Sequence, residues 1–137
     1  MGYRVVDTTA DIGVEAWGKD LKELFEETAR GLLSLMADTE KVRVKEQIEW
    51  ETEGIDAEDT LISMLNDIIY LHETKRMVFK DVQVKEIDEK RVRFALKGER
   101  IDPERHTLNT EVKAATYHNI RIERKEDGFK TKVIFDL

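Results

Sequence analysis

Two segments of the chain repeat apolar residues at the spacing of one buried helical face. In the first, over 21–33, apolar positions recur three and four residues apart, and Asp20 with Glu23 three residues later resembles a capping box. In the second, Asp56 stands where a helix N-cap is expected, and one apolar face continues over 61–72. We therefore predict two helices, and we expect the second to be nearly fully buried.

Elsewhere the apolar period changes to two, which is typical of strands with one buried face. The alternating residues fall in six short segments: Ile12, Val14 and Ala16; Val42, Val44, Ile48 and Trp50; Val82 and Val84; Val92, Phe94 and Leu96; Ile120 and Ile122; and Val133, Phe135 and Leu137. Because two helices interrupt a strand-rich order, we predict one α+β domain over 1–137, with both helices packed on a mostly antiparallel sheet. The least regular stretch, 98–110, is predicted to be a loop, and long loops often carry function.

The composition restricts the classes of protein that fit this pattern. The 137 residues are 40% hydrophobic and 39% charged, with one Pro and no Cys. Without Cys the chain offers no thiol nucleophile, zinc finger or iron–sulfur cluster. No apolar run approaches the ~20 residues of a transmembrane helix, and no signal-peptide pattern opens the chain, so we expect a cytoplasmic protein without stable membrane association. Abundant Glu, Lys and Arg beside few Asn and Gln is typical of a thermophile.

The net charge of −7 argues against a surface that coats nucleic acid, because phosphate binding needs a basic footprint. A local basic patch is still compatible with this charge. Direct contact with RNA therefore stays open for two basic groups, although a solvated network of ion pairs is the simpler interpretation of them. These groups are Lys90, Arg91 and Arg93, and Arg121, Arg124 and Lys125.

Most catalytic motifs are missing from the sequence. The Gly residues are too scattered for a nucleotide-binding loop, and both Ser residues fall inside the predicted helices. The three His residues are too far apart in sequence to form a metal-binding motif. We interpret His72, on a helical face, as a core or edge residue. His106 in the long loop and His118 near a strand end are more open, and each fits either a functional or a merely exposed role.

Carboxylates at strand ends are the remaining candidates for chemistry. Asp7 and Asp11 flank 8–10 before one strand, and Asp136 stands near the end of the last one, so their oxygens suit a hard cation. Asp11 and Asp136 are out of phase with the buried positions and should point away from the core, yet spacing alone favours two solvated aspartates. Leu137 is in phase with Val133 and Phe135, so we expect the last strand to reach it. A terminal carboxylate would then lie beside Asp136, and a frayed end is the alternative.

Several segments, in order along nearly the whole chain, resemble the archease family. They are Thr8-Thr9-Ala10-Asp11-Ile12-Gly13, Asp67-Ile68-Ile69-Tyr70-Leu71, Gly98-Glu99 to Arg105-His106, Glu111-Val112-Lys113-Ala114-Ala115-Thr116-Tyr117-His118, and Asp136-Leu137. Archeases are small protein cofactors of the RtcB-type RNA ligase, which joins tRNA halves during tRNA splicing. They promote its guanylylation and repeated turnover and broaden the nucleoside triphosphates that it accepts. The resemblance implies an activator that is not itself an enzyme.

The resemblance also implies a cation site. Archeases bind a divalent cation, seen as calcium, through the aspartate of the TAD motif and the C-terminal end of the chain. Here this implies Asp11, Asp136 and Leu137, the last through a main-chain or terminal oxygen, with Ca²⁺ expected and Mg²⁺ or Mn²⁺ as alternatives. One position departs from the family, because Thr8 stands where many members have His. Any function of that imidazole is then absent here or performed by another residue.

Three further residues are candidates for contact with the ligase: Lys113, His106 and His118. Lys113 interrupts an otherwise apolar or small stretch. It is either an outward strand lysine or a contact to acidic groups of the ligase or to a triphosphate.

Two other classes of function stay open. In one, the protein is a chaperone-like modulator that contacts a client protein through apolar helix faces or sheet edges. In the other, less favoured, it is a metal-dependent phosphohydrolase. That chemistry generally needs more ligands than two aspartates and a terminus.

Overall fold

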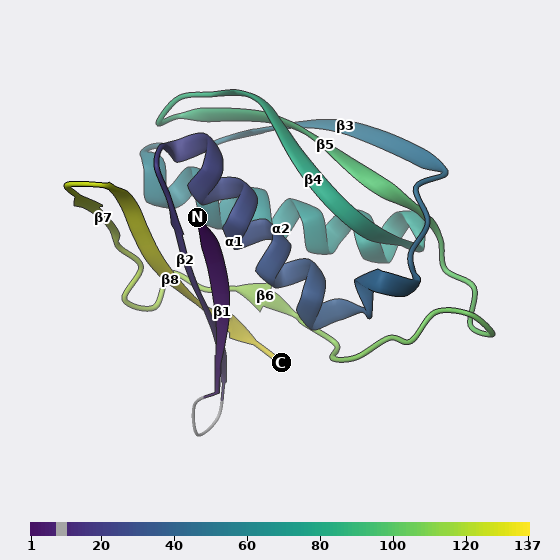
Figure 1. The fold of residues 1–137 in the computed structure, drawn as a ribbon. Coiled ribbons are helices and arrows are strands. Elements are labelled where there is room, and N and C mark those ends of the chain that lie inside the picture. The colour runs from purple at the N-terminus through teal and green to yellow at the C-terminus, as the bar shows by residue number, and fades with distance from the viewer. Residues whose placement is uncertain (8–10) are drawn as a thin grey trace.

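The computed structural model describes residues 1–7 and 11–137, so Thr8 and the rest of 8–10 lie outside the described residues. Within that part of the chain the strands form two antiparallel sheets, and the two α-helices lie in the layer between them (Figure 1). The predicted α+β class with antiparallel pairing is therefore confirmed, and the strands are divided between two sheets.

The larger sheet is centred on its last strand. Its order is β1-β2-β8-β6, and β7 pairs with β8 on the side away from β2. The smaller sheet has the order β3-β5-β4. The bounds in the larger sheet are β1 (Gly2–Asp7), β2 (Ile12–Gly18), β6 (Ala114–Ala115), β7 (Ile122–Lys125) and β8 (Gly128–Asp136), and those in the smaller are β3 (Glu46–Glu53), β4 (Met77–Ile87) and β5 (Arg91–Arg100).

Both helices begin where the sequence predicts. The Asp20 carboxylate accepts a hydrogen bond from the Glu23 backbone N–H at 2.8 Å, which caps α1 (Leu21–Met36). Asp56 caps α2 (Ala57–Lys75) in the same way. The expectation that the second helix is nearly fully buried is wrong in part, because α2 contacts the sheets on only part of its circumference and Tyr70 is 55% exposed. No helix among the described residues is long and apolar enough to span a membrane.

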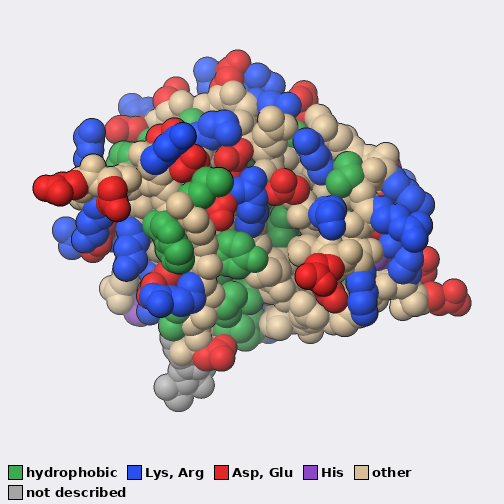
Figure 2. Space-filling view, in the orientation of Figure 1, with side chains coloured by type: hydrophobic (Ala, Val, Ile, Leu, Met, Phe, Trp, Pro, Cys, Tyr) green, Lys and Arg blue, Asp and Glu red, His purple; other side chains and the backbone are tan. Residues whose placement is uncertain are grey.

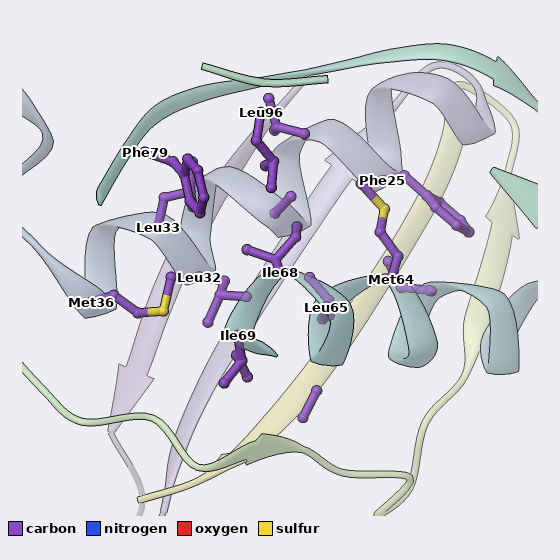
Figure 3. Packing of buried hydrophobic residues seen from close by; sticks show 14 of the residues in the cluster. Phe25, Leu32, Leu33, Met36, Met64, Leu65, Ile68, Ile69, Phe79 and Leu96 are labelled. Atoms are coloured by element: carbon purple, nitrogen blue, oxygen red, sulfur yellow. The ribbon is translucent and has the colours of Figure 1, made fainter. Parts of the chain in front are cut away.

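The core lies between the helices and the two sheets (Figure 3). Phe25 and Leu32 of α1 and Leu65 and Ile68 of α2 are all 0% exposed, and they occupy the predicted apolar faces. Burying each such side chain stabilises the fold by roughly 1.5–3 kcal/mol. The helices therefore anchor both sheets through one continuous apolar layer.

In the smaller sheet, strand boundaries differ from the prediction at two places. The strand expected from Val42 begins only at Glu46, because Val42 follows a short 3₁₀ turn, η1 (Thr39–Lys41), and its N–H bonds the Thr39 carbonyl. Val44 is 54% exposed, so its alternation with Val42 marks no strand. Residues 98–100 belong to β5 rather than to the loop.

The two ends of the larger sheet also differ from the prediction. β1 was not predicted, because Tyr3 and Val5 remain 37% and 41% exposed and give a weak alternation. β8 ends at Asp136, and Leu137 is 43% exposed beyond it, although its phase predicts burial. The alternation of apolar residues therefore no longer predicts burial beyond the last paired residue of a strand.

Gly98→Ala is expected to lower the free energy of unfolding by about 1–3 kcal/mol. A Cβ at this position would lie 2.0 Å from the Val78 carbonyl oxygen, so β4 and β5 would have to separate. Gly2→Ala is the matched control, since its methyl group would meet only the Trp17 ring at 3.0 Å and that ring is partly exposed. Urea denaturation checks both, and equal midpoints for the two variants would contradict the close approach.

Candidate functional site

Three segments that are distant in sequence meet at one end of the larger sheet. Ile12 pairs with Phe135 as the last pair between β2 and β8, and Asp11 and Asp136 are the adjacent residues in the two segments. On the other side of β8, Ala114 pairs with Asp136. Figure 1 shows the C-terminal end of the chain beside β6. We call this place, formed by Asp11, Lys113, Asp136 and Leu137, the strand-end corner.

The strand-end corner is open to solvent. Asp136 and Lys113 are exposed, Asp11 is half-buried, and Phe135 next to Asp136 is fully buried. The predicted direction of Asp136, away from the core, is therefore confirmed. The Lys113 backbone N–H donates to the Asp136 carbonyl at 2.9 Å, which fixes the two residues side by side.

The donors at the corner are oxygens of the kind that hard cations prefer. Asp11 and Asp136 each supply a carboxylate, and the Asp136 carbonyl accepts the Lys113 N–H. In the described part of the chain, no group of three or more His, Asp or Glu side chains is placed to hold a metal ion. The oxygens of the corner thus match a divalent cation in type, and two of them belong to charged side chains.

Asn66 holds β6 in place, and sequence reasoning missed it. Its side-chain Nδ2 donates to the Ala115 carbonyl at 3.1 Å, and its Oδ1 accepts from the Ala115 N–H at 2.8 Å. The amide of an α2 residue therefore satisfies both backbone groups of a buried strand residue, as a neighbouring strand would. A single Asn inside a helical pattern carries no signal of such a contact, which depends on the tertiary fold.

Tyr117 provides a second attachment of this segment to α2. Its hydroxyl donates to the Asp59 carboxylate at 2.6 Å. This hydrogen bond raises the pKa of Tyr117 and lowers the pKa of Asp59. The chain from β6 to Tyr117 is thereby fixed along α2 at two points, although the Tyr117 ring is 56% exposed.

His106 is not an open loop residue, because its side chain is only 1% exposed. Its Nδ1 accepts from the Asp102 N–H at 2.8 Å, so the ring proton lies on Nε2, which is 2.9 Å from the Glu99 carboxylate. His106 therefore ties the loop after β5 to the end of that strand. The other two histidines fit the sequence interpretation: His118 is exposed, and the half-buried His72 has its Nδ1 2.6 Å from the Met77 carbonyl.

Glu99 is the centre of this buried polar cluster. The Arg105 guanidinium, which donates to the carboxylate at 2.5 Å, holds the pKa of Glu99 well below its usual range against the opposing effect of burial. The Arg43 N–H and His106 add to the lowering. The loop that leads from β5 to Lys113 and β6 thus begins at a fixed anchor.

Comparisons with known proteins agree with this architecture. The model of the Archease protein family matches residues 3–137. The protein archease of Pyrococcus furiosus is 42% identical over 124 residues, which cover 88% of this chain and 87% of the relative. A solution structure of a Methanobacterium thermoautotrophicum protein matches with a TM-score of 0.77 and 33% identity over 99% of both chains. A crystal structure of a Thermotoga maritima archease, described as a possible chaperone, matches with a TM-score of 0.68 and 29% identity over 98% of this chain and 96% of that one.

Glu99→Gln is expected to lower the free energy of unfolding at neutral pH by about 1–3 kcal/mol, because the amide loses the charge that Arg105 binds. The pKa of Glu99 is lower in the folded than in the unfolded chain. Its stabilisation is therefore fully present above the ordinary pKa of 4.5 and is lost as the pH falls toward the folded pKa.

Urea denaturation at several pH values between 7 and about 2.5 measures this effect, because this range includes the ordinary pKa of a glutamate in an unfolded chain. Wild type should lose stability more steeply with acid than Glu99→Gln. Glu89→Gln is the matched control, because Glu89 is exposed and should keep the wild-type slope. Identical slopes for wild type and Glu99→Gln would contradict the assignment.

Asn66→Ala is expected to lower the free energy of unfolding by about 1–3 kcal/mol, because two buried backbone groups of Ala115 lose their partner. Hydrogen exchange at the amides of 113–116 should also accelerate, whereas exchange in the smaller sheet should not. Asn66→Asp keeps the acceptor for the Ala115 N–H and loses the donor to its carbonyl, so its effect separates the two bonds. Unchanged exchange at 113–116 in Asn66→Ala would argue against the attachment.

Proposed function

Since this chain belongs to the archease family, we propose that it acts as a protein cofactor of an RtcB-type RNA ligase in tRNA splicing. In this function it promotes guanylylation and repeated turnover of the ligase, broadens the nucleoside triphosphates that the ligase uses, and performs no catalysis alone. The observation that supports the proposal most is the pairing of Ile12 with Phe135, because it brings the adjacent residues Asp11 and Asp136 to the same end of the larger sheet.

In the proposal, a divalent cation is held at the strand-end corner by the carboxylates of Asp11 and Asp136 and a main-chain or terminal oxygen of Leu137. Ca²⁺ suits this oxygen set, and Mg²⁺ or Mn²⁺ are the alternatives. When bound, such an ion supplies positive charge that offsets the charge of phosphate oxygens.

The remaining contributions come from the chain itself. Lys113 adds an ammonium group next to Asp136, where its backbone is fixed by the hydrogen bond to the Asp136 carbonyl. His118 is exposed two residues after Thr116, whose N–H and hydroxyl both donate to Ile134 of β8. We expect these side chains to position acidic or phosphate groups of the ligase complex. His106 is buried, so its contribution is to hold the loop.

A second candidate function is supported by exposed apolar side chains. Tyr3 and Val5 are partly exposed on β1, which is an edge strand of the larger sheet. Figure 2 shows hydrophobic side chains gathered on the face that carries β1 in Figure 1. A chaperone-like modulator could hold a client protein there, in keeping with the description of the Thermotoga maritima relative. That activity would not depend on Asp11 or Asp136.

Ligation with excess RNA and GTP tests the proposed function. Asp11→Asn and Asp136→Asn should each reduce stimulation of the ligase and calcium affinity by roughly tenfold or more. Asp127→Asn is the matched control, because Asp127 is an exposed aspartate in the turn before β8, far along the strand from Asp136. It should behave as wild type.

Calorimetry with Ca²⁺ and circular dichroism accompany the assay. If both folded corner variants stimulate ligation as well as wild type, the cation proposal is wrong. Suppression of client aggregation by wild type and by both corner variants, without ligase stimulation by any of them, would favour the chaperone function. Hydrolysis of nucleotide or RNA by the protein alone would favour the phosphohydrolase.

A further inference from the structure

A hollow of about 280 Å³ lies on the outer face of the larger sheet, away from the strand-end corner. Lys130 and Lys132 are two residues apart on β8, so they share one face of the sheet, while Thr131 and Val133 face the core. Lys132 pairs with Glu15 of β2, and Lys130 pairs with Glu123 of β7, which brings both acids to the same face. We call this hollow, lined by Glu15, Asn119, Arg121, Glu123, Lys130 and Lys132, the cationic pocket.

The two acids of the cationic pocket are already paired with cations outside its lining. Glu15 accepts a hydrogen bond from Arg4, which lowers the pKa of Glu15. Glu123 is 3.2 Å from the Lys125 ammonium group. Both acids also face the pocket lysines across the strands, so the lining holds two negative and three positive side chains.

The three bases of the pocket outnumber its two acids by one charge. Among the described residues, no ion pair involves Arg121, Lys130 or Lys132. Lys130 and Lys132 also help to lower the pKa of Glu15, which places their charges near the pocket wall. Figure 2 shows Lys and Arg side chains interspersed with Asp and Glu over the side of the molecule that carries β7 and β8 in Figure 1. A protein of net charge −7 thus presents a local positive hollow.

We propose that the cationic pocket binds phosphate groups, either of an RNA strand or of a nucleoside triphosphate. Three cations without a close ion pair among the described residues suit a ligand that carries more than one negative charge. The guanidinium, the two ammonium groups and the Asn119 amide are donors that match phosphate oxygens as acceptors. The proposal rests on the proposed function only in its choice of ligands, which are the substrates of an RNA ligase.

The cationic pocket and the strand-end corner lie along the same strand, β8. Lys132 and Asp136 lie four residues apart on the same face of β8, a separation of about 13 Å along a strand. A short polyphosphate or RNA segment in the pocket would therefore extend toward the corner along β8. The sheet face would then hold the substrate while the corner contacts the ligase.

Fluorescence anisotropy with a labelled single-stranded RNA of about ten nucleotides tests the pocket, with unlabelled GTP and pyrophosphate as competitors. The measurement uses the full chain, with EDTA and without ligase, so it is independent of the corner and of ligase stimulation. Arg121→Gln, Lys130→Gln and Lys132→Gln are combined in one variant. The matched control combines Lys80→Gln, Lys85→Gln and Arg100→Gln, three exposed positions on the smaller sheet with the same change in charge.

The pocket variant should lose most of the binding and make the slope of log K against log salt shallower by about 2 for RNA. The control should match wild type, and Lys130→Arg with Lys132→Arg should retain binding. Displacement of RNA by GTP assigns the site to nucleotide phosphates as well, and failure of GTP to displace it assigns the site to RNA; both outcomes support the proposal.

Two results would overturn the proposal. These are absence of binding of any phosphate ligand to wild type, and equal weakening of binding in the pocket and control variants. Neither bears on the effect of Asp11→Asn or Asp136→Asn, so failure here and failure of the proposed function are distinguishable.

Discussion

The docking of β8 between β2 and the pair β6 and β7 is the constraint on which both candidate sites depend. One edge of β8 pairs with β2 along its length, and the other pairs with β7 at its start and β6 at its end. This pairing brings Asp136 to the end of the sheet where Asp11 lies, and it places Lys130 and Lys132 between residues of β2 and β7. A shift of one residue in the register would move every β8 side chain to the opposite face and abolish both arrangements.

Local features were predictable from the sequence because their causes are local. The Asp20 and Asp56 caps and the apolar faces of both helices depend on neighbours within a few residues, and the structure contains them as predicted. The strand ends were less predictable. Val42 and Leu137 continue an apolar alternation past the point where a partner strand exists, and only tertiary pairing determines where that point lies.

The residues of the candidate site likewise differ in whether the sequence could identify them. Asp11 and Asp136 could be chosen from the sequence through a resemblance, and Asp136 from its phase, whereas Asn66 could not, because its amide bonds Ala115 across 49 positions of sequence. The sequence interpretation took the buried His106 for an open loop residue, because no local pattern indicates that the loop folds back onto Glu99. Polar residues whose partners are distant in sequence need a structure to be interpreted.

The place of β8 in chain order has a consequence for synthesis on the ribosome. Every other strand of the larger sheet precedes β8, so β2 is without this partner until residues 128–136 have emerged. A nascent chain can form both helices and the smaller sheet from contacts closer in sequence, while the edge of β2 stays exposed to other chains. The strand-end corner is completed by the same step that closes this edge, so a chain able to display Asp11 beside Asp136 is one whose larger sheet is already assembled.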